Sequence, residues 1–303
     1  MIDRRSVLGL AAAAVAFTLT PAAAQDWKAK YPEIVFGKIP DENASGVTER
    51  YGPLMDFLSK ELGVKVTLRI AQDYAAVIEG QRAGQIHIGF YGPASYARAT
   101  LVGAKIEPVA IEVNADGTKG YYSVFYVKKD SPYTKIEDLK GKNLGLVDPN
   151  STSGNNVPRF ALDKMKIEPE SYFSKVVYTG SHENAVIALS QGTVDVAANW
   201  WNDENESNLK RMERKGMAKY DDYRIIFKSS QIVNSPIAIL SDLPADMKTA
   251  ISSALLAFPV KDPEAFKKMT DGKQKPWAPV DHEAYKPVIE LISFVDSLRK
   301  KKS

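Results

Sequence analysis

The chain has 303 residues, of which 44% are hydrophobic and 25% charged, with 40 Lys and Arg against 37 Asp and Glu and a formal net charge of +3. This ordinary composition excludes a disordered or fibrous chain, and the small net charge gives no reason to expect nucleic acid as a partner. Cysteine is absent and only three histidines occur (His87, His182 and His282), which excludes disulfides, thiolate metal sites and a cysteine nucleophile. We therefore expect neither a bound metal nor another cofactor.

The first 24 residues have the pattern of an export signal. Arg4 and Arg5 precede an apolar stretch from Val7 to Leu19, and small residues follow up to Ala24. A basic start, an apolar centre and small residues at the end are typical of a signal peptide, and the apolar run is shorter than the roughly 20 residues that a membrane span needs. We expect cleavage after Ala24 and a periplasmic product. The arginine pair also fits a twin-arginine signal, so either export route stays open.

Beyond the signal, short apolar runs rich in β-branched residues alternate with segments that have apolar residues at helical spacing. In chain order the patterns predict strands over 34–36, 64–70 and 86–91 and helices over 51–62, 74–83 and 93–101. This order of strand, helix and strand is typical of right-handed βαβ units and of a largely parallel sheet.

The same alternation continues through the rest of the chain. The patterns predict strands over 122–128, 143–147, 176–179, 194–198, 224–228 and 236–240, and helices over 155–165, 183–190, 247–258 and 285–295. No Pro/Gly/Ser-rich linker interrupts them, so we expect an α/β protein with two lobes, between which the chain crosses near 127–130 and 223–230. The first lobe would then comprise 25–127 and 231–303, and the second 128–230.

Three consecutive hydroxyl residues follow one of the predicted strands. Ser151, Thr152 and Ser153 lie between the strand that ends at Val147 and a predicted helix. Such a turn offers unpaired backbone N–H groups, the positive end of the helix dipole and hydroxyl donors, which together can bind an oxyanion without Lys or Arg. A single hydroxyl suffices for an ordinary helix cap, which is the alternative interpretation.

Two further polar clusters also follow predicted strands. His182 lies at a turn that opens a helix, where its ring N–H can donate to an anion; the alternative, which the residue taken alone favours, is a surface histidine at a helix start. Trp200 and Trp201 precede the acidic residues Asp203 and Glu204. Because a carboxylate only accepts hydrogen bonds, Asp203 suits a ligand that keeps a proton or carries an amine; the alternative is the acidic first turn of an exposed helix.

Tyrosines lie near the ends of the predicted strands, where ligand crevices of α/β proteins are found. Tyr74, Tyr91 and Tyr121 hold such positions. A buried phenol usually has a hydrogen-bond partner, which a bound anion can supply, and ordinary packing is the alternative for each of them. The sequence contains no nucleophile elbow, His-Glu-x-x-His, Gly-x-Gly-x-x-Gly or P-loop motif, which argues against an enzyme.

Several segments resemble the periplasmic phosphonate-binding subunits of ABC transporters, within the phosphate/phosphite/phosphonate-binding group. In the order that the family has them, these segments are 51–54, 73–78, 89–96, 121–123, 138–142, 148–154 and 180–186. The resemblance implies two α/β lobes, joined by two crossover strands, that close on a ligand. It also implies a solute-binding protein rather than an enzyme, a small phosphorus-containing anion and an inner-membrane ABC permease as partners, and a monomer.

The resemblance further implies which residues bind the ligand. The PO₃ group would be held by hydroxyl and N–H donors, with an acid at the far end of the ligand: Tyr74, Tyr121, Ser151, Thr152, Ser153, His182 and Asp203, with Tyr91, Trp200, Trp201 and Glu204 as further candidates. Members that bind an aminoalkyl phosphonate place a second acid just before the Pro of a late strand, whereas 233–236 here contains no carboxylate.

The ligand therefore stays open between 2-aminoethylphosphonate, methylphosphonate and phosphite. For the two smaller ligands, Trp200 or Trp201 would supply an apolar wall. The alternative functions are binding of a different small solute on the same fold, and an exported hydrolase that uses Ser151 or His182.

Overall fold

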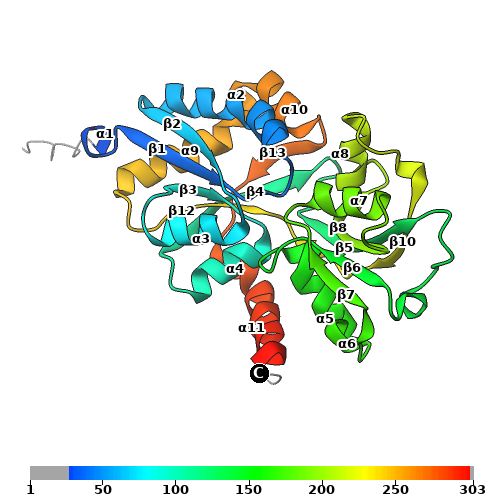
Figure 1. The fold of residues 1–303 in the computed structure, drawn as a ribbon. Coiled ribbons are helices and arrows are strands. Elements are labelled where there is room, and N and C mark those ends of the chain that lie inside the picture. The colour runs from blue at the N-terminus through cyan, green and yellow to red at the C-terminus, as the bar shows by residue number, and fades with distance from the viewer. Residues whose placement is uncertain (1–26, 301–303) are drawn as a thin grey trace, which may run out of the picture.

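The computed structural model describes residues 27–300, which form two α/β lobes, each built on its own β-sheet (Figure 1). The predicted signal peptide, residues 1–24, lies outside the described residues. In the part of the chain that the structure describes, no helix is long and apolar enough to cross a membrane.

The first lobe contains a six-stranded sheet with the strand order β13-β4-β12-β3-β1-β2. The strands are β1 (Glu33–Lys38), β2 (Lys65–Ile70), β3 (Ile88–Phe90), β4 (Ile106–Asn114), β12 (Pro236–Leu240) and β13 (Gln274–Ala278). The strands β1, β2 and β3 run parallel, as βαβ units require, while β12 pairs antiparallel with both β3 and β4. The sheet is thus mixed rather than largely parallel.

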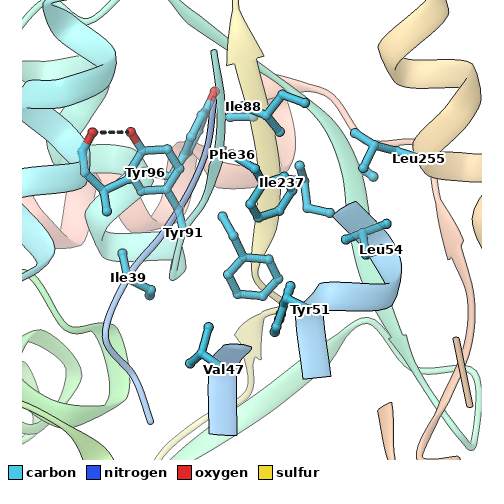
Figure 2. Close-up of a cluster of buried hydrophobic side chains, with 14 of the residues drawn as sticks. Phe36, Ile39, Val47, Tyr51, Leu54, Ile88, Tyr91, Tyr96, Ile237 and Leu255 are labelled. Carbon is cyan, nitrogen blue, oxygen red and sulfur yellow. Dashed lines mark hydrogen bonds between the residues drawn. The ribbon is translucent and has the colours of Figure 1, made fainter. Parts of the chain in front are cut away.

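Helices cover both faces of this sheet, with α2 and α9 on one side and α3 and α4 on the other (Figure 1). The helices of the first lobe are α1 (Trp27–Lys30), α2 (Ala44–Leu62), α3 (Tyr74–Arg82), α4 (Pro93–Leu101), α9 (Ala245–Lys261), α10 (Pro263–Thr270) and α11 (Lys286–Lys300). Figure 2 shows side chains from β1, α2, β3, β12 and α9 packed into one core, among them Phe36, Leu54, Ile88, Ile237 and Leu255. This core fixes the ends of β1 and β3, from which cavity residues project.

The second lobe contains a seven-stranded sheet with the order β10-β5-β8-β6-β7, to which β9 and β11 add short pairings. The strands are β5 (Gly120–Lys128), β6 (Asn143–Leu146), β7 (Lys175–Tyr178), β8 (Val196–Asp203), β9 (Glu206–Ser207), β10 (Tyr223–Lys228) and β11 (Ile232–Val233). The helices are α5 (Val157–Lys164) and α6 (Pro169–Tyr172) on one face and α7 (His182–Ser190) and α8 (Asn208–Arg214) on the other (Figure 1).

The chain crosses between the sheets at two points that lie side by side. It leaves the first sheet after β4 and enters the second with β5, and it returns between β11 and β12. The crossings are thus at 115–119 and 234–235, whereas the sequence patterns suggested 127–130 and 223–230. The reason is that β5 and β10 pair with each other inside the second sheet, while the first two residues of β5 pair with β11.

Side-chain amides tie these crossing segments together. The Asn114 carboxamide oxygen accepts hydrogen bonds from Asn202 Nδ2 at 3.0 Å and Asn234 Nδ2 at 3.2 Å. Asn114 Nδ2 in turn donates to the Gly120 carbonyl at 2.7 Å. One asparagine at the end of β4 therefore contacts both crossings and the second lobe.

Candidate ligand-binding site

A cavity of about 80 Å³ lies where the two lobes meet, and residues from both lobes line it. The first lobe contributes residues that follow β1 and β3, and the second contributes the turn after β6 and residues of α7 and β8. Seven residues singled out from the sequence line this cavity, namely Tyr74, Tyr121, Ser151, Thr152, Ser153, His182 and Trp200. Sequence patterns thus led to residues that are distant along the chain but adjacent in the fold.

The hydroxyl triplet is buried in a tight turn between β6 and α5. Ser151 Oγ accepts a hydrogen bond from Gly154 N at 3.1 Å, so this residue does cap the π-helical turn Thr152–Asn156. Thr152 Oγ1 accepts one from Ala94 N at 2.8 Å, at the start of α4 in the other lobe. A hydroxyl whose oxygen accepts a bond keeps its proton for donation. Capping and anion binding are therefore compatible in this turn.

Glycine at 154 makes the turn possible. A Cβ atom placed there would lie 2.4 Å from the Val147 side chain and 2.7 Å from Ser151 Oγ. The backbone of the turn consequently approaches the end of β6 more closely than any other residue type allows.

Tyr74 and Tyr121 bring phenol groups to the hydroxyl triplet. Burial raises the pKa of Tyr74 well above its ordinary value, and nearby carboxylates raise it further, while a hydrogen bond with Ser151 opposes the shift. Burial also raises the pKa of Tyr121, against hydrogen bonds with the Thr152 and Ser153 hydroxyls. Both phenols are therefore protonated at neutral pH and able to donate.

His182 is a buried, neutral side chain at the start of α7. Burial lowers the pKa of His182 to about 4, although the nearby Asp41 carboxylate favours the charged form. Its ring Nδ1 is buried and has no hydrogen-bond partner among the described residues. An imidazole with its proton on this nitrogen offers a neutral N–H to a bound anion.

Residues that the sequence patterns did not single out complete the cavity. Among them are Glu112, Asn114, Gln274 and Arg211, which lie on β4, β13 and α8, elements that the patterns did not predict. The alternation of Val109, Ile111 and Val113 is a strand signal, but Pro108 interrupts the run, and proline argues against an inner strand. The structure accommodates Pro108 where the register between β4 and β12 shifts.

Ion pairs connect α8 and the residue after it to the first lobe. Lys215 Nζ lies 3.0 Å from a Glu42 carboxylate oxygen of the first lobe and 2.7 Å from one of Glu183 on α7. Arg214 pairs with Asp271 of the first lobe at 2.8 Å. Because these contacts span the lobes, the structure describes a closed arrangement.

Glu42 is a buried member of this network that is contacted by cations from both lobes. Burial alone would raise the pKa of the Glu42 carboxyl, but the Arg50 and Arg211 guanidinium groups hold it well below its usual range. The Arg50 contact is 2.5 Å long. Glu42 is thus a permanent anion that attracts cations from both lobes.

In the described residues no group of three or more His, Asp or Glu side chains is arranged to hold a metal ion.

Comparison with known proteins identifies the family. Residues 36–285 match the family model described as the periplasmic substrate-binding protein of the phosphonate ABC transporter. The chain belongs to this family. It is a family of substrate-binding transport proteins that work with an ABC permease, not of enzymes, and membership confirms the two-lobed α/β fold that the resemblance implied.

Individual relatives agree with this membership. The chain is 34% identical over 237 residues to the phosphonates-binding periplasmic protein of Escherichia coli (strain K12), an alignment that covers 77% of this chain and 67% of the relative. It is 32% identical over 217 residues to the phosphate-import protein PhnD of Mycolicibacterium smegmatis, covering 69% and 66%. A solved binding protein of an ABC phosphonate transporter from Pseudomonas aeruginosa superposes with a TM-score of 0.79 at 28% identity, covering 88% of this chain and 87% of that one.

Two acidic residues that the resemblance suggested lie away from the cavity in this family member. The strand β8 continues to Asp203 and turns back into β9, instead of ending near residue 198. Asp203 Oδ1 therefore accepts hydrogen bonds from Asn205 N at 2.6 Å and Glu206 N at 3.0 Å, within the turn. Glu204 is exposed and accepts a bond from the Tyr220 hydroxyl at 3.2 Å. Neither is among the lining residues.

Two aromatic candidates also pack elsewhere. The Tyr91 hydroxyl donates to Gln81 Oε1 at 2.7 Å within the first lobe. Trp201 packs against Tyr122, with ring centroids 5.8 Å apart, whereas its neighbour Trp200 lines the cavity. Successive residues of a strand point to opposite faces, so only one tryptophan of the pair can reach the cavity.

Proposed function

We propose that this protein binds a small phosphonate or related phosphorus oxyanion between its lobes and delivers it to an inner-membrane permease. The observation that carries the proposal is the convergence of neutral donors on one cavity. Ser151, Thr152 and Ser153 meet the phenols of Tyr74 and Tyr121 there. Neutral donors with fixed positions can hold a PO₃ group when they replace its water shell.

The proposed mechanism is closure of the lobes around the anion. The second lobe supplies the hydroxyl triplet and His182, while the first lobe supplies Tyr74. Only the closed arrangement brings these groups to the same ligand, so ligand binding shifts the population toward it. The permease would then meet the liganded, closed form.

Calorimetry of the purified protein tests this function. We expect methylphosphonate, phosphite or an aminoalkyl phosphonate to bind with a Kd in the micromolar range or below, corresponding to about −8 kcal/mol. The variant that combines Ser151→Ala and Thr152→Ala should lose at least about a hundredfold in affinity, because each hydrogen bond to a charged group is worth about 1.5–3 kcal/mol.

The matched control is Ser171→Ala, since Ser171 is exposed in the second lobe and bonds only to the Glu168 carbonyl. If no phosphorus oxyanion binds more tightly than about 1 mM, the proposed function is wrong. If the double variant binds like Ser171→Ala, the hydroxyl triplet is not part of the site.

We also propose that the chain is exported with cleavage after Ala24 and acts as a monomer. The basic, apolar and small-residue regions of 1–24 support cleavage, and Arg4-Arg5 supports the twin-arginine route. Intact mass of the periplasmic product measures the cleavage site, and light scattering measures the oligomeric state. Unchanged export of a variant with both arginines replaced by lysine would contradict the twin-arginine route.

A further inference from the structure

Two of the three carboxylates that line the cavity are already neutralised by cations. Asp41 pairs with Lys38, which is buried, at 2.5 Å. Glu206 accepts from Arg211 at 3.0 Å and from Arg214 at 2.7 Å. Neither carboxylate is left to neutralise a charge on a ligand.

The third carboxylate, Glu112 on β4, has no cationic partner. Its Oε1 accepts one hydrogen bond, from Gln274 Nε2 at 2.7 Å, and Glu112 forms no ion pair with any Lys, Arg or His of residues 27–300. Burial raises the pKa of Glu112, while the hydrogen bond from Gln274 and the more distant Lys38 and Arg211 cations oppose the shift. A carboxylate in such surroundings is stabilised by any cation that reaches it.

The ion pairs around the cavity do not include Glu112. Around the cavity, five cationic side chains form ion pairs with five carboxylates: Lys38, Arg50, Arg211, Arg214 and Lys215 with Asp41, Glu42, Glu183, Glu206 and Asp271. Glu112 is not in this set, although it lines the same cavity. Lys273 also lines the cavity, but among the described residues it forms no ion pair with Glu112, so the Glu112 carboxylate is open to an ammonium group of the ligand.

The Glu112 side chain is also held in place. Trp277 Nε1 donates to Gln274 Oε1 at 3.0 Å, and this fixes the Gln274 amide whose nitrogen binds Glu112. With one carboxylate oxygen occupied by Gln274, the other is left to accept a bond from the ligand. Glu112 is thus a preorganised acceptor rather than a mobile surface acid.

We infer that Glu112 accepts a hydrogen bond from an ammonium group of the ligand, so that the substrate class is the zwitterionic aminoalkyl phosphonates. The inference rests on the proposed function, since the phosphonate group would occupy the donors around Ser151 and Tyr74. An ammonium partner removes the cost of a buried, unpaired carboxylate, and a ligand with an alkyl end leaves that cost in place. Glu112 is therefore a specificity-determining residue.

Matched ligand pairs test the inference by calorimetry. The probes are aminomethyl-, 2-aminoethyl- and 3-aminopropylphosphonate, each compared with the alkyl phosphonate in which methyl replaces the ammonium group. The wild-type protein should bind at least one amine about tenfold or more tightly than its alkyl counterpart. In Glu112→Gln this preference should disappear through at least a tenfold loss for the amine, with alkyl binding changed by less than about threefold.

The chain offers a matched control on the same strand. Glu107 also lies on β4, but it pairs with Lys248 at 3.0 Å and is not among the lining residues, so Glu107→Gln should change neither affinity. Equal losses for amine and alkyl ligands in Glu112→Gln, or no amine preference in the wild type, would overturn the inference alone. If the wild type binds none of the six compounds, nor phosphite or phosphate, the proposed function fails as well.

Discussion

Single residues of the cavity are available as neutral hydrogen-bond donors because burial fixes their protonation. The phenols of Tyr74 and Tyr121 keep their protons at neutral pH, and the His182 ring stays uncharged. We therefore expect the site to bind an anion through geometry and the loss of water rather than through net charge, which agrees with the small charge of the whole chain.

His182 should make the stability of the protein depend on pH. The pKa of His182 is about 4 in the folded protein, against an ordinary value of 6.5, so between these values the unfolded chain binds the proton and the folded chain does not. The free energy of unfolding should therefore fall as the pH is lowered from about 6.5 to 4, by up to about 3 kcal/mol from this group.

Chemical denaturation at several pH values measures this effect. His182→Asn removes the titrating ring, so the difference in unfolding free energy between wild type and variant should shrink steadily below pH 6.5. A difference that stays constant from pH 7 to pH 4 would mean that the ring titrates normally in the fold.

Residues close in the sequence could be predicted, and residues that the fold brings together could not. The local sequence pattern places the hydroxyl triplet and His182 at strand-to-helix turns, where it predicts hydrogen-bond donors. Asp203 has the right chemistry, but its place depends on how far β8 continues, which a local pattern does not show. Glu112 belongs to no motif, yet its backbone N lies 3.4 Å from the Ser235 carbonyl on the neighbouring chain segment. Glu112 thereby supplies a carboxylate beside residues 233–236, which contain none.

At the scale of elements, the turn after β6 has no room for a side chain at residue 154. Gly154→Ala would place a Cβ 2.4 Å from Val147, and relieving that overlap must shift either the strand or the hydroxyl triplet. We expect a loss of about 1–3 kcal/mol in unfolding free energy and weaker ligand binding.

Gly52→Ala is the natural comparison. Gly52 lies inside α2, and a Cβ there meets nothing within 4 Å, so the change should stabilise the helix by up to about 1 kcal/mol. Thermal unfolding and calorimetry of both variants check the contrast. Equal effects at the two glycines would show that the turn relaxes freely.

Elements with strong apolar periodicity were predictable, and those that depend on tertiary contacts were not. The helix α4 spans Pro93–Leu101, as its pattern predicts, because proline begins it and its apolar residues repeat regularly. The strand β13 contains a proline, and α8 has only two buried apolar residues, Leu209 and Met212. These two elements form through pairing with β4 and through the ion pairs of α8, which a single sequence does not reveal.

At the scale of the whole molecule, the ion pairs between lobes should favour closure. Lys215→Ala removes the cation shared by Glu42 and Glu183, while Arg50 still neutralises Glu42. Because Lys215 is a quarter exposed, we expect a moderate effect, about a tenfold loss in ligand affinity, although Lys215 is not among the cavity-lining residues.

Lys210→Ala is the matched control, since Lys210 contacts only groups of the second lobe, namely Glu213 on the same helix and the Tyr220 ring. Raising the salt concentration should lower the ligand affinity of the wild type more than that of Lys215→Ala, because salt weakens the ion pair that the variant lacks. If the two lysine variants bind alike, the inter-lobe ion pairs do not contribute to closure.

The paired crossing segments have a mechanical consequence. Two strands that lie side by side and share the hydrogen bonds of Asn114 act as a flexure, which bends easily about one axis and resists torsion about the others. We expect opening and closing to follow a single coordinate. The two lobes would then sample few relative orientations, and each closure would bring the same donors to the same positions around the ligand. The precision of recognition is thus set as much at the hinge as at the cavity.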